Sequence, residues 1–320
     1  MKVLVLGGCG FIGSHVVDSL LNAGLKVRVL DRVPESFRPL LSDVEYVCAD
    51  FRNQTSVRDA LTDIDVVMHL VNASVPATAA LDPQADVRDN LVATVSLLES
   101  MRKLKANKLI YLSSGGTVYG IPENVPTKES EPLLPVCSYG IVKVAIEHYI
   151  RLYTREHGIA ATILRPSNAY GPRQGHRGIQ GAVGTFLYQA MNDEPIRVWG
   201  DGSVIRDYLY VEDLADLCMR CATSQTTGVF NAGYGEGLRI DDVIDQIGTA
   251  TGKKLRVFYS EGRTHDVPVS VLDITSARQV LGWAPRTDFA SGIMHHWNWL
   301  RSVSNESNDG LEIMNTNTRS

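Results

Sequence analysis

The fold of this chain is decided by KVLVLGGCGFIG, residues 2–13. The apolar, β-branched run at 2–7 predicts a buried strand, and the apolar spacing from 11 to 22 predicts an amphipathic helix directly after it. Three glycines at G-x-x-G-x-x-G spacing lie between and within these elements: Gly7, Gly10 and Gly13. Gly8 lets the same stretch fit G-x-G-x-x-G as well.

Glycines at this spacing allow a tight turn, a close approach of a pyrophosphate to bare backbone, and close contact between the helix and the strand. The free N–H groups of the helix N-terminus, at Phe11 and Ile12, would then face the phosphates. The stretch therefore predicts a dinucleotide site in which the glycines and the start of the helix hold the phosphates.

Acidic residues end the next two predicted strands. Asp31 follows Gly13 by 18 residues, and a carboxylate there can accept both ribose hydroxyls of an adenosine while repelling a 2′-phosphate. Arg32 argues toward NADP, but the position of Asp31 at the strand end favours NAD. Asp50, at the end of the third strand, is placed to meet the adenine edge; the alternative is an ordinary solvated loop acid.

Short β-branched runs alternate with longer amphipathic segments through the first half of the chain. Strands are expected at 2–7, 26–31, 44–50, 65–71, 108–114 and 159–166, and helices at 11–22, 56–63, 87–104 and 138–157. This alternation predicts an α/β fold with a doubly wound, Rossmann-type parallel sheet.

Past Tyr170 the chain becomes rich in Gly and Pro, which predicts a smaller C-terminal substrate-binding lobe over the carboxyl edge of the sheet. Residues 1–170 are expected to form the dinucleotide-binding domain. Residues 171–301 mainly form the second lobe, with part of 204–232 returning to the sheet. The polar, patternless stretch 302–320 is interpreted as a flexible tail.

Composition excludes several classes of function. The net charge of −5 gives no basic surface for nucleic acid or an anionic membrane. We expect no membrane span and no signal peptide, because no apolar run has the required length. Cys218 and Cys221 form a CxxC, but no second pair or nearby His accompanies them, so no metal site is predicted. Five scattered cysteines fit a reducing cytoplasm.

SYGIVK, residues 138–143, places Tyr139 and Lys143 about one helical turn apart, so both side chains lie on one face of the predicted helix. By itself this spacing is compatible with an exposed aromatic residue beside a solvated lysine. The remaining motifs decide between that interpretation and a catalytic pair.

Seven segments occur in an order that resembles the extended short-chain dehydrogenases/reductases. They are GGCGFIGSH (7–15), HLVNASVP (69–76), the helix containing Asn90, SSGGTVYG (113–120), YGIVK (139–143), RPSNAYGPRQ (165–174) and WGDGSVIRDYLYVEDLA (199–215). The resemblance covers residues 1 to about 300 and is strongest to the NAD-dependent nucleotide-sugar epimerases and dehydratases, UDP-sugar 4-epimerases in particular.

This resemblance implies that Tyr139 takes or gives the proton of a sugar hydroxyl while NAD takes or gives the hydride. It implies that Lys143 hydrogen-bonds the nicotinamide ribose. A phenol has a pKa near 10, and we expect Lys143 and the positive nicotinamide to lower it toward neutrality. The implied cofactor contacts also include Leu70, Asn90, Ser113 and Pro166.

The third catalytic position departs from the family pattern. Relatives of the 4-epimerase type carry S-S-S-A-T-V-Y-G, where this chain has Gly115 in place of the third Ser. Thr117 is the best local substitute, with Ser114 behind it near the nicotinamide, and an ordered water is the alternative. Dehydratases carry S-T-D-E-V-Y-G, whereas Gly116 and Thr117 cannot act as that acid–base pair.

The resemblance also implies a sugar-nucleotide site. Its expected residues are Asn168 near the diphosphate, Ala182 and Val183 presenting backbone to uracil, Arg206 and Arg263 binding the diphosphate, Asp266 contacting the nucleotide ribose or supporting Arg263, and Ser270 beside the sugar. Arginine suits a diphosphate because its planar fork pairs with two oxygens. A small residue at Ser270 would leave room for an acetamido group; the alternative is that it only repacks the wall.

These features predict an NAD-retaining 4-epimerase of UDP-hexoses or UDP-N-acetylhexosamines that serves polysaccharide or glycoconjugate synthesis. The alternatives are a keto-sugar reductase or a UDP-glucuronate-type epimerase or decarboxylase. An NAD-sensing regulator is disfavoured because Tyr139 and Lys143 are both intact. The helices at 87–104 and 138–157 resemble those of a four-helix-bundle homodimer, although the apolar stripe in VATVSLLESM could equally pack on its own sheet.

Overall fold

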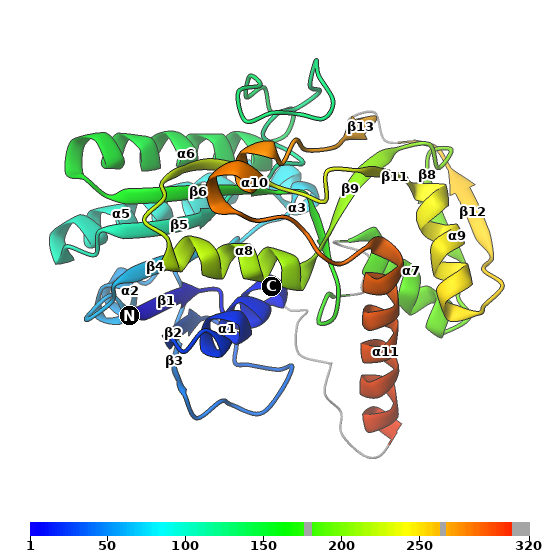
Figure 1. Ribbon diagram of the computed structural model, residues 1–320, viewed down its shortest axis with the longest axis horizontal. Coiled ribbons are helices and arrows are strands. Elements are labelled where there is room, and N and C mark those ends of the chain that lie inside the picture. Colours follow the sequence, from blue (N-terminus) through cyan, green and yellow to red (C-terminus); the bar gives the residue numbers. More distant parts are fainter. Residues whose placement is uncertain (176–180, 263–266, 309–320) are drawn as a thin grey trace.

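A seven-stranded parallel sheet organises the larger lobe of the molecule (Figure 1). The computed structural model describes residues 1–175, 181–262 and 267–308. The strands of this sheet are β1 (Lys2–Leu6), β2 (Lys26–Asp31), β3 (Val44–Cys48), β4 (Val66–His69), β5 (Lys108–Leu112), β6 (Ala160–Pro166) and β10 (Gly228–Ala232). The α/β fold with a doubly wound parallel sheet is thereby confirmed.

The strand order of the sheet is β10-β6-β5-β4-β1-β2-β3. The chain runs outward from β1 to β3 and then returns to place β4 on the other side of β1. In open parallel sheets, the crevice between two strands whose connections leave in opposite directions is where ligands bind. Here that crevice lies between the carboxyl ends of β1 and β4.

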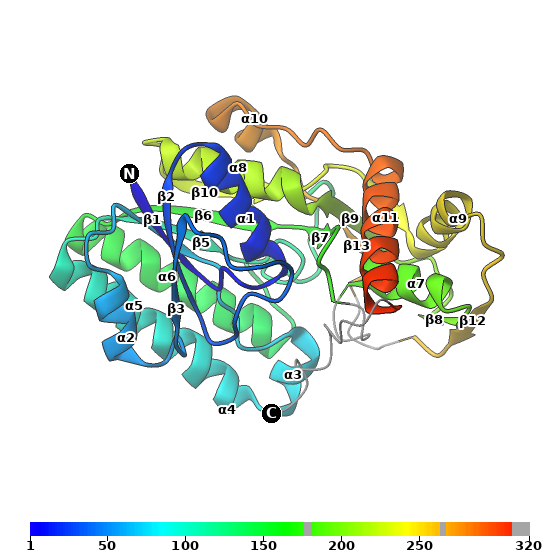
Figure 2. The same cartoon turned by 90° about the horizontal axis from the view of Figure 1, so that it is seen from below.

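Alternate residues of the central strands face opposite layers of helices, as strand geometry requires. Val3 and Val5 pack toward α1 (Phe11–Asn22), α8 (Val211–Thr223) and α10 (Thr275–Leu281). Leu4 and Leu6 pack toward α2 (Gln54–Ala60), α5 (Ala93–Leu104) and α6 (Ser138–His157). Figure 2 shows these two helical layers on opposite sides of the strands. Both faces are therefore covered, which explains why the strands read as nearly continuous apolar runs.

The helix predicted at 87–104 is two elements. Its first turn is the π-helix η1 (Val87–Val92), and α5 follows from Ala93. Two short helices, α3 (Pro76–Leu81) and α4 (Pro83–Asp86), precede it and were not predicted. Side-chain periodicity does not distinguish a π turn from an α turn, and in this turn Asn90 is hydrogen-bonded to Ala73 and Ser74 of the loop after β4.

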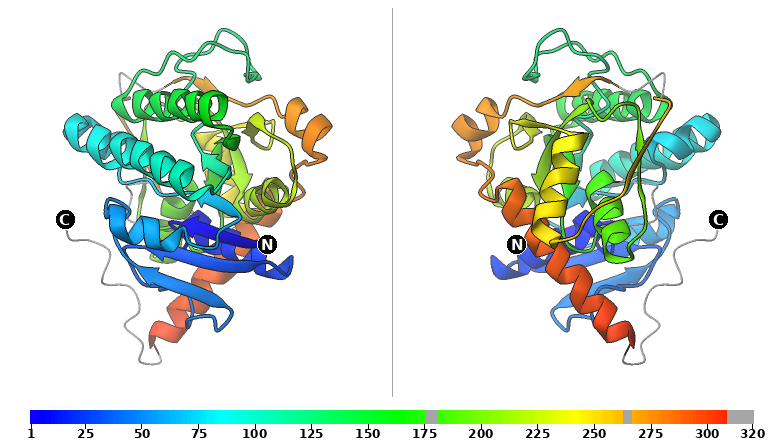
Figure 3. Two further views of the ribbon diagram at one scale, coloured as in Figure 1. Left: turned by 90° about the vertical axis from the view of Figure 1, so that its left-hand side faces the viewer. Right: turned by 90° about the vertical axis from the view of Figure 1, so that its right-hand side faces the viewer.

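The smaller lobe has its own core and its own sheets. Its strands are β7 (Asn168–Tyr170), β8 (Ile196–Trp199), β9 (Ile205–Tyr210), β11 (Gly237–Arg239), β12 (Val257–Ser260) and β13 (Val269–Ser270). Strand β9 pairs with β7, β11 and β13, while β8 pairs with β12. The helices α7 (Ala182–Met191), α9 (Ile240–Thr251) and α11 (Phe289–Asn308) enclose this core, and Figure 3 shows α9 and α11 beside each other.

Helix α11 corrects one expectation about the C-terminus. The polar stretch from 302 was interpreted as a tail, but the helix continues to Asn308. The apolar residues Ile293, Trp297 and Leu300 anchor α11 in the lobe. Extending an existing helix adds one hydrogen bond per residue without the cost of nucleation, so its polar last turns persist. Residues 309–320 lie outside the described part of the chain.

No helix within residues 1–175, 181–262 and 267–308 is long and apolar enough to cross a membrane.

Candidate active site

The glycine turn between β1 and α1 is packed too closely for side chains. A Cβ on Gly13 would lie 2.0 Å from the Gly7 carbonyl oxygen, and one on Gly8 would lie 2.7 Å from the Val29 side chain. Gly7 has a φ of +84°, a conformation that favours glycine. Gly10 forms the N-cap of α1 and has no side chain to cap it. The N–H groups at Phe11 and Ile12 therefore begin a helix that can receive an anion.

Asp31 lies directly beside this turn. Its carboxylate accepts hydrogen bonds from the Cys9 N–H at 3.0 Å and the Val33 N–H at 3.2 Å. Burial raises the pKa of the Asp31 carboxyl, and the hydrogen bonds from the backbone act against that rise. Arg32, the residue that favoured NADP in the sequence, is exposed. The predicted acid is thus held beside the glycine turn, at the carboxyl end of β2.

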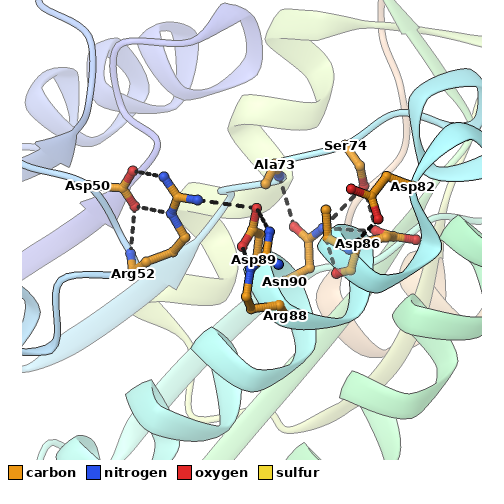
Figure 4. A network of polar contacts seen from close by, with 10 residues as sticks. Asp50, Arg52, Ala73, Ser74, Asp82, Asp86, Arg88, Asp89 and Asn90 are labelled. Carbon is orange, nitrogen blue, oxygen red and sulfur yellow. Dashed lines mark hydrogen bonds and ion pairs between the residues drawn. The ribbon is translucent and has the colours of Figure 1, made fainter. Parts of the chain in front are cut away.

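Asp50 is engaged by a neighbouring arginine. Arg52 donates to it through Nε at 2.9 Å and Nη2 at 2.7 Å, and reaches Asp89 of η1 at 3.2 Å (Figure 4). These hydrogen bonds lower the pKa of the Asp50 carboxyl. An adenine contact by Asp50 stays a prediction, and the ion pair with Arg52 is the contact that the described residues supply.

The loop that follows β4 forms the other wall of the crevice. Leu70 donates its N–H to the Leu6 carbonyl at 3.0 Å, and a Cβ on Gly7 would lie 3.1 Å from the Val71 nitrogen. Asn90 holds the loop from η1, since its Oδ1 accepts the Ala73 N–H at 2.8 Å. The two candidate residues Leu70 and Asn90 therefore lie at or behind the crevice, and the side chain of Asn90 is used within the protein.

Tyr139 and Lys143 lie in the first turns of α6, on its buried side. Lys143 is 4 % exposed, and its Nζ donates to the Leu112 carbonyl at 3.0 Å. The same Nζ lies 4.9 Å from the centre of the Tyr111 ring and 5.7 Å from that of Tyr139. The sequence-predicted pair is thus brought together beside the end of β5, and the alternative of an exposed, solvated lysine is wrong.

The electrostatics of this pair differ from the expectation. Burial lowers the pKa of Lys143 to about 8, although Glu147 and Asp86 act to raise it. Burial also raises the pKa of Tyr139, with further upward effects from Asp86 and Cys137, whereas a hydrogen bond with Asn72 acts the other way. The protein residues alone do not bring the phenol pKa toward neutrality, because desolvation, the largest effect, disfavours the phenolate.

Thr117 carries a hydroxyl without a protein partner, and its backbone lies against Gly140 of α6, next to Tyr139. Within the described residues its Oγ1 is buried and has no hydrogen-bond partner. A buried hydroxyl left unpaired is costly, and such groups are typical of places where a ligand supplies the missing hydrogen bond. Ser114 is half-buried in the same turn, and its carbonyl accepts the Val118 N–H at 3.2 Å.

Gly115 has no room for the side chain that relatives carry. A Cβ there would lie 2.5 Å from Leu272 Cδ1 and 2.9 Å from the Arg165 carbonyl oxygen. Leu272 is 1 % exposed and packs with Val118 and Tyr119. Leu272 therefore fills the place that a Cβ at residue 115 would take, and the water suggested for the missing hydroxyl stays a prediction.

Ser113 belongs to a buried network that the sequence did not reveal. Its Oγ donates to Glu147 Oε1 at 2.6 Å. Glu147 pairs through both oxygens with Arg165, at 3.0 and 2.6 Å. Arg165 donates in turn to the Tyr119 hydroxyl at 2.8 Å. Because the Ser113 hydroxyl donates its proton to Glu147, it could meet a cofactor only as a hydrogen-bond acceptor.

Three candidate substrate residues lie on neighbouring strands of the small sheet. Asn168 of β7 is opposite Tyr208 of β9, and Ser270 of β13 is opposite Arg206 of β9. Arg206 and Tyr208 are two residues apart, so all of these side chains share one face of the sheet. Asn168 donates to the Asp207 carbonyl at 3.1 Å, and Ser270 is 9 % exposed.

The remaining candidates are placed less directly. Arg206 donates to the carbonyl oxygens of Ile205 and Val267, at 2.9 and 2.6 Å. Pro166 is buried at the end of β6, and its carbonyl accepts the Gly115 N–H at 2.8 Å. Ala182 and Val183 begin α7, where the side chain of Val183 is in the lobe core, so only backbone groups could meet a ligand. Arg263 and Asp266 lie outside the described residues.

Sequence reasoning missed Asp86, a buried acid at the end of α4. It accepts hydrogen bonds from Ser74, Asn90 and Ser138. Its four-residue separation from Asn90 was the available signal, because residues four apart meet on a helix. Among the described residues, no group of three His, Cys, Asp or Glu side chains is arranged to hold a metal ion. Cys218 and Cys221 are buried thiols in α8.

Comparison with known proteins agrees with this geometry. The model of the NAD dependent epimerase/dehydratase family matches residues 3–233. The UDP-glucose 4-epimerase of Mycolicibacterium smegmatis is 34 % identical over 313 residues, covering 95 % of this chain and 100 % of the relative.

Two crystal structures are similar over nearly the whole chain. The UDP-glucose 4-epimerase of Thermotoga maritima with UDP-glucose has a TM-score of 0.91 and 32 % identity, covering 95 % of this chain and 100 % of its own. The Thermus thermophilus UDP-glucose 4-epimerase in complex with NAD has a TM-score of 0.88 and 33 % identity, covering 94 % and 99 %. Since the family model matches well over half of the residues, this chain belongs to the NAD-dependent epimerase/dehydratase family.

Proposed function

We propose that this protein is an NAD-dependent 4-epimerase of a UDP-sugar. The observation that carries the proposal is the arrangement of Tyr139, Lys143 and the unpaired Thr117 hydroxyl beside the crevice of the parallel sheet. Relatives that match over nearly the full chain include UDP-glucose 4-epimerases, one of them solved with UDP-glucose and another with NAD.

The residues present fit a bound dinucleotide. The glycine turn leaves bare backbone at Gly10, where only the Gly7 carbonyl lies within 4 Å of an added Cβ, and Asp31 supplies the acid for the adenosine ribose. Gly7, Gly13, Phe11 and Ile12 would hold the pyrophosphate through backbone N–H groups. When bound, NAD accepts a hydride from the sugar C4 and returns it to the resulting 4-keto sugar.

Tyr139 acts as the base that takes the proton of the C4 hydroxyl. It returns the proton after the 4-keto sugar has rotated to present its other face. The ammonium of Lys143 stabilises the phenolate and would reach the nicotinamide ribose. Thr117 donates or accepts the hydrogen bond that relatives obtain from the serine missing at Gly115. Ser114 lies behind Thr117 and supports it.

The small sheet would bind the sugar nucleotide. Arg206 and Asn168 would contact the diphosphate, and the start of α7 would meet the uracil through backbone groups. Ser270, a small side chain opposite Arg206, leaves space beside the sugar. We therefore expect UDP-N-acetylhexosamines to be accepted in addition to UDP-hexoses.

Epimerisation is favoured over dehydration because the stretch 115–117 has no acidic side chain. Elimination of water across C5 and C6 needs an acid and a base there, and Gly115, Gly116 and Thr117 provide neither.

We further propose a homodimer that forms through α5 and α6. Apolar side chains on these helices and on the preceding η1 are exposed: Val92 is 53 % exposed, Ile141 57 % and Tyr149 40 %. Burying them against a second copy would give a four-helix bundle. Ile141→Glu should convert the dimer to a monomer in sedimentation velocity, whereas Val280→Glu, an exposed apolar residue on α10, should not.

All five cysteines are free thiols, which supports a reducing cytoplasm as the place of action. The product sugars would supply polysaccharide or glycoconjugate synthesis.

The function is tested by incubating purified protein with a panel of UDP-sugars and separating the products by chromatography. Interconversion of C4 epimers without added cofactor is the expected result, and Tyr139→Phe should abolish it while leaving NAD bound. Net consumption of NADH with a keto-sugar would instead identify a reductase. Binding without turnover of any sugar would contradict catalysis altogether.

A further inference from the structure

Asp86 is a buried carboxylate that the proposed chemistry leaves without a role. It is 3 % exposed and ends the short helix α4. Its Oδ1 accepts the Ser74 hydroxyl at 2.6 Å and the Asn90 amide at 2.9 Å, and its Oδ2 accepts the Ser138 hydroxyl at 2.8 Å. Figure 4 shows Asp86 together with Ser74 and Asn90.

These partners come from three separate elements around the active site. Ser74 belongs to the loop after β4, Asn90 to η1, and Ser138 to the first turn of α6. Ser138 directly precedes Tyr139 in the sequence, so a hydrogen bond to its hydroxyl fixes the backbone that carries the phenol. The Asn90 Oδ1 in turn accepts the N–H of Ala73, in the same loop as Ser74, at 2.8 Å.

We propose that Asp86 is a positioning residue for Tyr139: its carboxylate joins the first turn of α6 to the loop after β4 and sets a negative charge beside the phenol. The proposal rests on the proposed function, in which Tyr139 is the base.

A negative charge near a phenol opposes loss of its proton. Among the described residues, the charged or titratable groups that act on or lie near Tyr139 are Asp86 from α4, Cys137 at the N-cap of α6, Lys143 from α6, and Tyr111 from β5. Burial is the largest cause of the raised pKa of Tyr139, and the charge of Asp86 is the second largest. Asp86 therefore adds to the effect of burial in opposing ionisation of the phenol, and a cation placed beside Lys143 would act in the other direction.

This arrangement gives Asp86 two separable effects. One is geometric, through the hydrogen bond to Ser138. The other is electrostatic, through its charge. Asp86→Asn removes the charge but can keep the geometry, because the Asn oxygen can accept from Ser74 and Asn90 while its amide donates to the Ser138 oxygen. Ser138→Ala removes the hydrogen bond but keeps the charge.

The first readout is the ionisation of Tyr139 in the cofactor-free protein, followed by tyrosinate absorbance and corrected with Tyr139→Phe. Asp86→Asn should lower the Tyr139 pKa by about one unit, and Ser138→Ala should leave it unchanged. Asp82→Asn is the matched control, because Asp82 is an exposed N-cap of the same helix and Asn can also cap. Asp82→Asn should leave the Tyr139 titration the same as in the parent.

The second readout is the pH dependence of kcat/KM in the loaded enzyme. Asp86→Asn should move the acidic limb to lower pH by the same amount, and Ser138→Ala should lower kcat about five-fold without moving that limb. An unchanged titration and limb in Asp86→Asn would overturn the electrostatic role. If Asp86→Asn does not fold, a parent-like kcat in Ser138→Ala overturns the positioning role. The titration needs no substrate, so it stands even if no UDP-sugar is turned over.

Discussion

The pairing of Gly115 with Leu272 makes a prediction that can be tested by four variants. Gly115→Ala adds only a Cβ, yet that atom would lie 2.5 Å from Leu272 Cδ1 and 2.9 Å from the Arg165 carbonyl oxygen. Both distances are shorter than a Cβ tolerates; Leu272 is 1 % exposed, and the Arg165 carbonyl is backbone that cannot rotate away. The substitution therefore forces a shift in the packed wall behind Thr117.

The magnitude follows from core-packing energetics. Overpacking of this kind costs about 1–3 kcal/mol of the free energy of unfolding. Leu272→Ala alone should cost about 2–5 kcal/mol, because it removes a buried side chain and leaves a cavity. In the double variant the new methyl at 115 enters that cavity. The loss in the double variant should be smaller than the sum of the single losses by about 0.5–3 kcal/mol, the range found for residues in contact. The short approach to the Arg165 carbonyl persists, so the compensation is partial.

The assay is urea-induced unfolding followed by tryptophan fluorescence and by circular dichroism, with the two transitions required to coincide. Gly116→Ala is the matched control, because an added Cβ there meets nothing within 4 Å. It should change the free energy of unfolding by less than about 1 kcal/mol. If the losses of the two single variants add to that of the double variant within about 0.5 kcal/mol, Leu272 does not fill the place of the missing side chain and the reasoning is refuted.

Three further predictions concern the site and its support. Thr117→Val should lower turnover about 10- to 100-fold yet stabilise the fold by about 1 kcal/mol, because it removes a buried unpaired hydroxyl; turnover within a few-fold of the parent would contradict its role. Glu147→Gln leaves the buried Arg165 guanidinium without its ion pair and should cost about 3–5 kcal/mol in denaturation; a loss below about 1 kcal/mol would be inconsistent with that burial. Lys143 has a folded pKa of about 8 against an ordinary 10.5, so the unfolded state binds more protons between these values and stability rises with pH there. In Lys143→Met, the free energy of unfolding should increase by about 3 kcal/mol less than in the parent between pH 8 and 10.5. Parallel unfolding curves at these two pH values measure this difference, and an equal increase in both proteins would refute it.

Much of the fold could be predicted because its signals are local. The strand at β1, the glycine turn and α1 follow one another within a dozen residues, and each is specified by side-chain periodicity or by the backbone freedom of glycine. Helix α6 begins and ends where the pattern predicts, and its turn alone sets Tyr139 and Lys143 on one face. The strand–helix alternation then leaves a parallel sheet as the way to bury the apolar runs.

The directions of the pKa shifts could not be read in this way. The spacing of Tyr139 and Lys143 suggested a lowered phenol pKa, whereas burial and the carboxylate of Asp86 raise it. Desolvation depends on everything that packs around a group, including residues far away in the chain. A sequence motif specifies the neighbours along one helix and leaves the rest of the surroundings open.

What the sequence by itself determined is the series of elements and the pair of catalytic candidates on α6. The tertiary structure alone decided that Leu272 fills the space over Gly115, that Asp86 reaches Ser138 across 52 residues of chain, and that Ser113 is bound to the Glu147–Arg165 pair. The physical reason is that periodicity and turn chemistry act over a few residues. Volume and charge are instead balanced between residues that meet only after the chain has packed.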